Sequence, residues 1–327
     1  MKKERFHEID ILRGVAIFAM ILIHAAAYFP SNKTATFLWD FSQFAVPFFL
    51  FCSFYIFFKK AHVVERSQLL PYVYKRFKRL LIPYWIFLLF YIPLVKFYQP
   101  LQMSSEQIIR FVTATTIDND MSWLVTLFLM LTAFVPFIAY LRKRQKVWFY
   151  LYGVLSFAST IFLLFYPSPV HFKLVMWLPW SMMIYFTYYF VKRENKGLVP
   201  LFFLAVLLYD LSWAALSKQG HSLLHYDNKY PPNLFHLSYG VGMILIIFFL
   251  AKKKVFDMWG IKQMLAFLSR YSYSLFFVHF LILFVMTTYF RLIFTPLPWW
   301  NFFGILFLSS LVIQFILARV TTIFSRS

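Results

Sequence analysis

An arginine and a histidine bound the first long apolar run of the chain, RGVAIFAMILIH (13–24). At 100° per residue, eleven positions make three turns plus about 20°, so Arg13 and His24 project from one helix face, ~16 Å apart along the axis. Asp10 lies on the same side of the helix start, within reach of Arg13. Neutral imidazole suits the removal of a proton from a hydroxyl group and can also act as a nucleophile. The predicted catalytic residues are therefore His24, Arg13 and Asp10, with His24 as the residue that takes part in the proton transfer.

Each of these residues also has a structural interpretation. An arginine at a helix end is typical of a topology anchor that reaches the lipid headgroups. A histidine inside an apolar span can simply form a hydrogen bond to a neighbouring helix. Because an ionisable side chain inside a membrane is costly, the functional interpretation remains the stronger one for His24.

The composition places these residues in a membrane protein. The chain has 327 residues, of which 61% are hydrophobic and only 13% charged, and it contains 45 Phe and 8 Gly. Few glycines argue against a glycine-rich nucleotide-binding fold. The net charge of +20 lies mostly between apolar runs, which favours insertion topology and anionic lipid over nucleic acid. The single cysteine, Cys52, excludes an intrachain disulfide and a multi-cysteine metal site.

Ten apolar runs are long enough to cross a bilayer as helices. The sequence thus predicts an all-α, polytopic membrane protein with about ten transmembrane helices in a single domain, 1–327. Lysine and arginine concentrate in alternate loops, for example RKRQK (142–146), which places both termini in the cytoplasm. The predicted spans are 11–29, 38–58, 79–98, 122–141, 147–166, 174–191, 198–216, 234–251, 271–290 and 299–319.

Five segments, in order along the chain, resemble one known family. EIDILRGVAIFAMILIH (8–24) resembles the first span of the acyltransferase-3 family of integral membrane acyltransferases, whose signature is an Arg, ten residues, then a His. The other similar segments are VPFFLFCSFYIF (46–57), RFKRLLIPYW (76–85), SWLVTLFLMLTAFVP (122–136) and YSYSLFFVH (271–279). Two positions depart from the family pattern: Pro47 stands where many members carry an Asp, and Phe54 stands where a Gly would follow Ser53.

The resemblance implies transfer of an acyl group, most often acetyl, from cytoplasmic acyl-CoA to a hydroxyl of a cell-surface or lipid-linked glycan. Phosphates of such a donor need cationic partners, and guanidinium groups bind phosphate with paired hydrogen bonds. Arg76, Lys78 and Arg79 are the predicted donor-binding residues, together with Ser53 of the second-span motif. A plain positive-inside loop explains the three cationic residues equally well.

The predicted acceptor-binding residues are Asp210, Trp123 and His279. Asp210 stands near the outer end of a span, where a carboxylate is costly unless it has a role. Trp123 can stack on a sugar or belong to the interfacial aromatic belt, and His279 can position a substrate or bond to another helix. No metal site is expected, because the histidines of the outer loop lack tight ligand spacing. No tightly bound cofactor is expected either.

Two functions remain open from the sequence. The first is a cell-membrane O-acyltransferase in which His24 is either the general base or an acyl relay. The second is a transporter or flippase for a lipid-linked glycan or a small anion, in which the same polar residues line a path.

Overall fold

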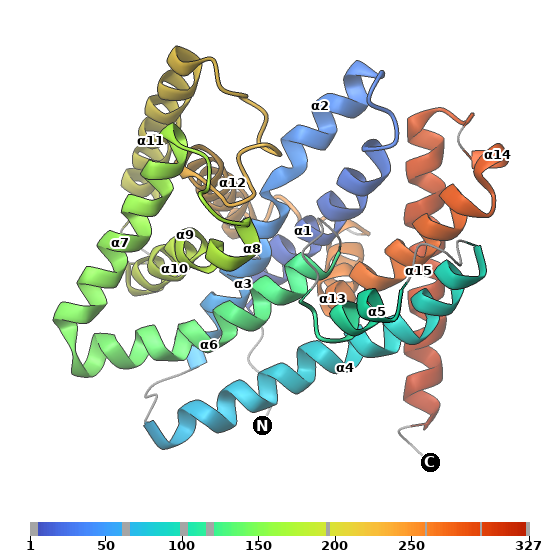
Figure 1. Ribbon diagram of the computed structural model, residues 1–327, viewed down its shortest axis with the longest axis horizontal. Coiled ribbons are helices and arrows are strands. Elements are labelled where there is room, and N and C mark those ends of the chain that lie inside the picture. Colours follow the sequence, from blue (N-terminus) through green and yellow to red (C-terminus); the bar gives the residue numbers. More distant parts are fainter. Residues whose placement is uncertain are drawn as a thin grey trace. The chain divides into compact units, whose positions relative to one another are not determined.

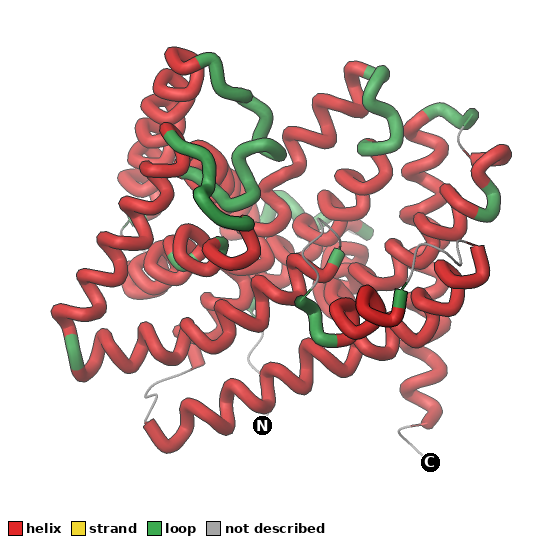
Figure 2. The backbone as a smooth tube through the Cα atoms, viewed as in Figure 1, coloured by secondary structure: helices red, strands yellow, loops and turns green. Residues whose placement is uncertain are grey.

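All regular structure in the described part of the chain is helical, as the computed structural model shows in Figures 1 and 2. The described residues are 6–60, 66–98, 104–115, 121–193, 197–258, 260–294 and 296–324. The chain forms two compact units. Unit 1 comprises Met1–Ala45, Leu89–Met103 and Leu250–Ser327, and unit 2 comprises Val46–Leu88 and Ser104–Phe249.

Nine helical segments among the described residues are long and apolar enough to cross a membrane. This confirms the prediction of an all-α, polytopic membrane protein. One segment, Lys33–Lys60, contains α2 (Lys33–Phe41), the short η1 (Ser42–Phe44) and α3 (Ala45–Lys60). The others are α1 (His7–Ala26), α4 (Arg66–Tyr98), α6 (Ser122–Arg144), α7 (Lys146–Phe165), α11 (Leu198–Gln219), α12 (Leu234–Lys252), α13 (Ile261–Thr288) and α15 (Trp299–Phe324).

The sixth predicted span, 174–191, is interrupted. It consists of α8 (Phe172–Val175), α9 (Trp177–Trp180) and α10 (Met182–Arg193). Met176 and Ser181 separate these pieces but keep right-handed helical dihedral angles. Pro179 has no backbone N–H and so cannot complete the hydrogen bond to the fourth preceding carbonyl, which weakens the helix at this point. The carbonyl of Trp177 accepts from both the backbone N–H of Ser181, at 3.1 Å, and its hydroxyl, at 2.6 Å.

Other differences concern helix ends. α4 begins at Arg66 rather than at 79, and α13 begins at Ile261 rather than at 271. Both helices therefore carry polar turns before their apolar spans, and hydropathy does not detect such turns. The structure also contains two short helices outside the predicted spans, α5 (Ser105–Val112) and α14 (Arg291–Phe294). The N-terminal lysines and parts of the basic loops lie outside the described residues.

In unit 1, α1 packs against α13 and α15, and the three helices lie side by side (Figure 1). Gly14 makes the close approach possible, because a Cβ atom there would lie 2.6 Å from the backbone oxygen of Leu265. On the α15 side, the ring of Phe18 meets the rings of Phe303 and Phe307 edge to face, with centroids 5.5 and 5.3 Å away. These contacts fix the rotation of α1 and so the direction in which its polar face points.

In unit 2, α3 is held by aromatic packing and by one close helix contact. The Phe51 ring lies 5.1 Å from that of Phe190, which in turn lies 4.9 Å from Phe248. Pro47 packs directly on Gly240, where a Cβ atom would come within 2.5 Å of its ring. Gly240 therefore makes room for Pro47, the residue that departs from the family pattern.

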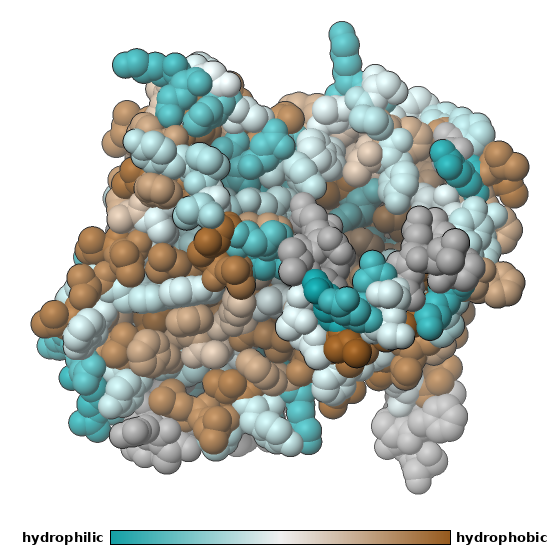
Figure 3. Space-filling model, in the orientation of Figure 1, coloured by the Kyte–Doolittle hydropathy of each residue, from teal (hydrophilic) through white to brown (hydrophobic). Residues whose placement is uncertain are grey.

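Several helices of unit 2 expose apolar side chains, as expected for a surface that contacts lipid. Along α7, Val147, Leu151, Val154 and Leu155 are all exposed. Figure 3 shows hydrophobic side chains over this helix on the visible face.

Candidate functional site

Two histidines that the sequence assigned to different roles meet in unit 1. His24, near the end of α1, and His279, in α13, have ring centroids 5.3 Å apart at an interplanar angle of 33°. The ring of Phe280 lies 4.4 Å from that of His24 and covers the pair on one side. His279 is fully buried, whereas His24 is half-buried. The structure thus places an accessible imidazole against a buried one.

The hydrogen bond of His279 assigns its tautomer. Its Nδ1 lies 2.9 Å from the carbonyl oxygen of Leu275, one turn earlier in α13. A carbonyl can only accept, so Nδ1 carries the proton and Nε2 keeps a lone pair. That Nε2 atom is buried and has no hydrogen-bond partner among the described residues. His279 therefore presents a fixed acceptor inside the helix bundle, beside His24.

The other predicted polar residues of α1 lie toward its beginning. Arg13 is half-buried on the same face as His24, and the continuous helix keeps them ~16 Å apart along its axis. Asp10 accepts a hydrogen bond of 2.9 Å from Ser269, which ties the start of α1 to α13. α13 thus contacts this polar face at Asp10 and again at His24. The pairing of Asp10 with Arg13 stays a prediction.

Two of the predicted donor-binding residues are paired in unit 2. The guanidinium of Arg76, in α4, donates to Ser53 Oγ, in α3, at 2.6 Å. Arg76 Nε is buried without a hydrogen-bond partner among the described residues. Lys78 and Arg79 are exposed, and Lys78 Nζ lies 5.0 Å from the centre of the Tyr74 ring. All three cationic residues lie within α4, so their spacing is set by a helix rather than by a loop.

The two remaining acceptor candidates, Trp123 and Asp210, differ in burial. Trp123, at the start of α6, is only 8% exposed, and its ring meets Tyr230 edge to face at 4.8 Å. Its neighbours are therefore protein groups. Asp210 is exposed on α11, and the structure does not bring it together with Trp123 through any described contact. The acceptor-binding roles of both stay predictions.

Sequence reasoning missed a buried lysine beside Trp123. Lys229, in the loop between α11 and α12, is only 4% exposed, and its Nζ lies 5.1 Å from the Trp123 ring and 5.2 Å from the Tyr230 ring. Burial lowers the pKa of Lys229 to about 7. Its position gave no signal in the sequence, because a single lysine in a polar loop is normally solvated.

Two histidines near this loop, His225 in the loop and His236 in α12, are buried and packed against other groups. His225 stacks on Tyr239 with ring centroids 3.9 Å apart, and burial lowers the pKa of His225 to about 4. His236 Nδ1 donates to the backbone carbonyl of His225 at 3.1 Å. Across the described part of the chain, no three His, Cys, Asp or Glu side chains gather as a metal site.

The helices and the histidine pair together define an integral membrane protein with a candidate acid–base centre inside its helix bundle. Residues 6–319 match the family model described as an acyltransferase domain (Acyl_transf_3), nearly the whole chain. The chain belongs to this family and is a multi-pass membrane acyltransferase. The comparisons with curated proteins and with solved structures gave no significant match.

Proposed function

We propose that the protein is an O-acyltransferase of the cell membrane that moves an acyl group, acetyl above all, from cytoplasmic acyl-CoA to a hydroxyl of a cell-surface or lipid-linked glycan. The observation that carries the proposal is the contact between His24 and His279 in a chain of this family. Neither residue alone distinguishes a catalytic group from a structural one. Side by side, they offer two nitrogen atoms suited to moving one proton.

In this proposal His24 is the base. It takes the proton of the acceptor hydroxyl as that oxygen attacks the thioester carbonyl, the new C–O bond forms and the C–S bond breaks. The thiolate of coenzyme A leaves and recovers the proton from His24. The lone pair on His279 Nε2, fixed by the bond to Leu275, orients the His24 ring or the hydroxyl. The relay role, in which His24 is itself acylated, uses the same geometry.

Arg13 supports the binding of the donor rather than the reaction itself. It lies ~16 Å from His24 on the same face of α1. An extended pantetheine arm separates the phosphates of coenzyme A from its thioester by a comparable length. A guanidinium at one end and an imidazole at the other therefore match the two ends of this donor. In unit 2, Arg76 with Ser53, and the exposed Lys78 and Arg79, are proposed to bind phosphate as well.

The test uses purified protein in nanodiscs with radiolabelled acetyl-CoA and a cell-envelope extract. Label should reach an envelope fraction with the wild type. It should fall by about 10²–10⁴-fold with His24→Ala and by a smaller factor with His279→Gln, because loss of a general base costs about that much. His221→Ala changes an exposed histidine of unit 2 and serves as the matched control, with full activity expected.

Other outcomes would contradict the proposal. Full transfer by His24→Ala would remove His24 from the mechanism. No transfer by any form of the protein, together with saturable binding of a lipid-linked sugar, would favour the transporter. An acyl group trapped covalently on the wild type but not on His24→Ala would select the relay over the base.

A further inference from the structure

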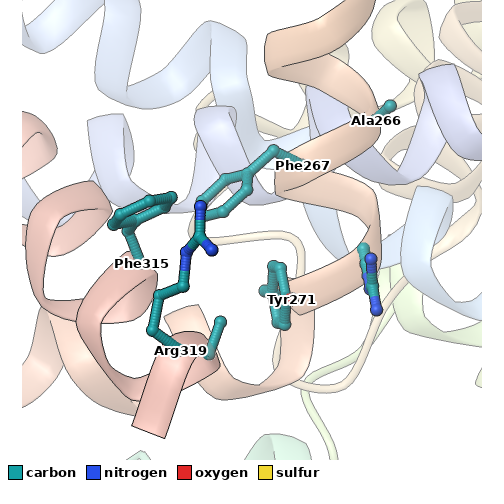
Figure 4. A pocket seen from close by; sticks show the side chains of 7 residues that line it. Ala266, Phe267, Tyr271, Phe315 and Arg319 are labelled. Atoms are coloured by element: carbon teal, nitrogen blue, oxygen red, sulfur yellow. The ribbon is translucent and has the colours of Figure 1, made fainter. Parts of the chain in front are cut away.

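Unit 1 contains a pocket of about 450 Å³ that the proposed acyl transfer does not use. It lies between α13 and α15 (Figure 4). α13 contributes Ala266, Phe267, Arg270 and Tyr271, and α15 contributes Phe315, Ala318 and Arg319. The lining residues thus include two arginines and three aromatic rings, and none of them is acidic.

Aromatic rings support both guanidinium groups. The Arg270 guanidinium lies 5.3 Å from the centre of the Tyr271 ring, and that of Arg319 lies 5.1 Å from the Phe315 ring. Figure 4 shows the Arg319 side chain extending past Phe315 toward Phe267. A guanidinium that rests on a ring keeps its N–H donors at its edge, where they can bind an oxyanion in pairs. The pocket is therefore complementary to a phosphate group.

The same face of α15 continues into an apolar stripe. Leu308, Val312, Phe315 and Arg319 follow one another at spacings of four, three and four residues, so they share one side of the helix. Leu308 is 61% exposed, Val312 58% and Phe315 51%. On a membrane-spanning helix, such a stripe contacts acyl chains. A ligand that fits both parts carries a phosphate at one end and hydrocarbon chains at the other.

We infer that this pocket is a binding site for an anionic phospholipid, with the headgroup phosphate between Arg270 and Arg319 and an acyl chain along Leu308 and Val312. Basic pockets between membrane helices bind such headgroups. The site stands near the end of α15 that the charge distribution places on the cytoplasmic side. Binding is independent of the acyl-transfer proposal, because it can be measured without any reaction. The phosphates of coenzyme A are the other possible ligand of the two arginines, but coenzyme A has no long hydrocarbon chain that would contact the apolar stripe.

The test counts lipids that remain bound to the purified protein. The protein is placed in mixed micelles with equal amounts of phosphatidylglycerol and phosphatidylcholine, and bound lipid is measured by native mass spectrometry. The wild type should retain phosphatidylglycerol in preference. Arg270→Gln/Arg319→Gln should reduce its affinity roughly tenfold or more, since each cationic residue contributes to headgroup binding.

The matched control is Lys143→Gln/Arg144→Gln, which removes two exposed charges from the end of α6 in unit 2. It should leave binding within about twofold of the wild type. Equal losses in both double variants would show general surface attraction and overturn the site. Displacement of phosphatidylglycerol by coenzyme A, but not by inorganic phosphate, would assign the pocket to the donor instead. If the double variant does not fold, Arg270→Gln and Arg319→Gln singly should each lower the affinity about threefold, and unchanged affinity in both would also overturn the site.

Discussion

His279 and His225 are both buried, but they differ in their hydrogen bonds and in the groups that pack against them. In His279, a helix carbonyl holds Nδ1 and leaves Nε2 as an acceptor beside His24. The ring of His225 is stacked with those of Tyr239 and Phe235, with centroids 3.9 and 4.7 Å away, and its Nδ1 is buried without a hydrogen-bond partner among the described residues. The first arrangement is suited to proton transfer, whereas the second favours only the neutral ring.

The stacked His225 predicts a loss of stability in acid. Burial lowers its pKa from 6.5 to about 4 in the folded protein, so the unfolded chain takes up a proton first as the pH falls. The contribution of this residue is complete above about pH 6.5 and declines toward pH 4, by as much as ~3 kcal/mol. His225→Phe keeps the stacked ring but cannot titrate.

Thermal unfolding in detergent between pH 7 and pH 4 measures this contribution. The melting temperature of His225→Phe should fall less with acid than that of the wild type. An identical decline in both proteins would contradict the assignment. Because other groups also titrate in this range, the difference between the two curves is the relevant quantity.

Among the elements, the contact of α1 with α13 is the one on which the candidate site depends. The two helices come close at Gly14, where the backbone of Leu265 leaves no room for a side chain. The hydrogen bond from Ser269 to Asp10 lies near the start of α1, and the histidine pair lies near its end. A substitution at Gly14 should therefore shift α1 against α13 and change the contact between His24 and His279, although Gly14 is distant from both.

We predict that Gly14→Ala lowers stability and acyl transfer together. The added Cβ would lie 2.6 Å from Leu265 O, and overpacking of this kind costs about 1–3 kcal/mol. Gly304→Ala in α15 is the control, because a Cβ there meets nothing within 4 Å. The measurements are the melting temperature and the transfer rate of both variants in nanodiscs. Equal behaviour of the two variants would show that α1 and α13 do not pack as described.

Hydropathy predicts most of the helices because a membrane span needs a long apolar run whatever it packs against. It misses the interruption of the sixth span at Met176 and Ser181, which depends on local backbone bonding around Pro179. It also misses the polar first turns of α4 and α13. A basic turn near the membrane surface is compatible with a helix or with a loop, so the apolar pattern alone does not place these helix ends.

On the scale of the whole molecule, the distribution of charge predicts its orientation. The basic residues at 142–146, where α6 ends and α7 begins, are predicted to lie on the cytoplasmic side, whereas the loop after α11 is predicted to lie on the outer side. The proposed function requires this orientation, since acyl-CoA is available in the cytoplasm.

Cysteine labelling tests the orientation directly. The native Cys52 is fully buried and should not react in the folded protein. Gln145→Cys and Gln219→Cys each add one exposed thiol, on opposite predicted sides. A membrane-impermeant maleimide should label Gln219→Cys on intact cells and Gln145→Cys only after permeabilisation. The reverse pattern would place the donor site outside the cell and contradict the acyl-CoA proposal.

The sequence predicts the members of the candidate site better than their arrangement. Arg13 and His24 follow from helix periodicity, and Arg76 and Ser53 come from separate motifs that the structure joins by a hydrogen bond. The pairing of His24 with His279 could not be predicted, because it depends on which helices pack together. Lys229 was missed because burial of a loop lysine leaves no periodic pattern.

The two histidines of unit 1 come from segments that are far apart in the sequence, Met1–Ala45 and Leu250–Ser327, and this has a consequence for biosynthesis. About 250 residues separate His24 from His279, and ribosomes add roughly 5–20 residues per second. The first helix, α1, is therefore synthesised roughly ten to fifty seconds before α13, the helix that carries His279. During this time Arg13 and His24 do not yet have α13 beside them. During this interval the nascent protein cannot catalyse the proposed reaction. The proposed pair of His24 and His279 therefore forms only after α13 has been synthesised, so products truncated before α13 are expected to lack acyl-transfer activity.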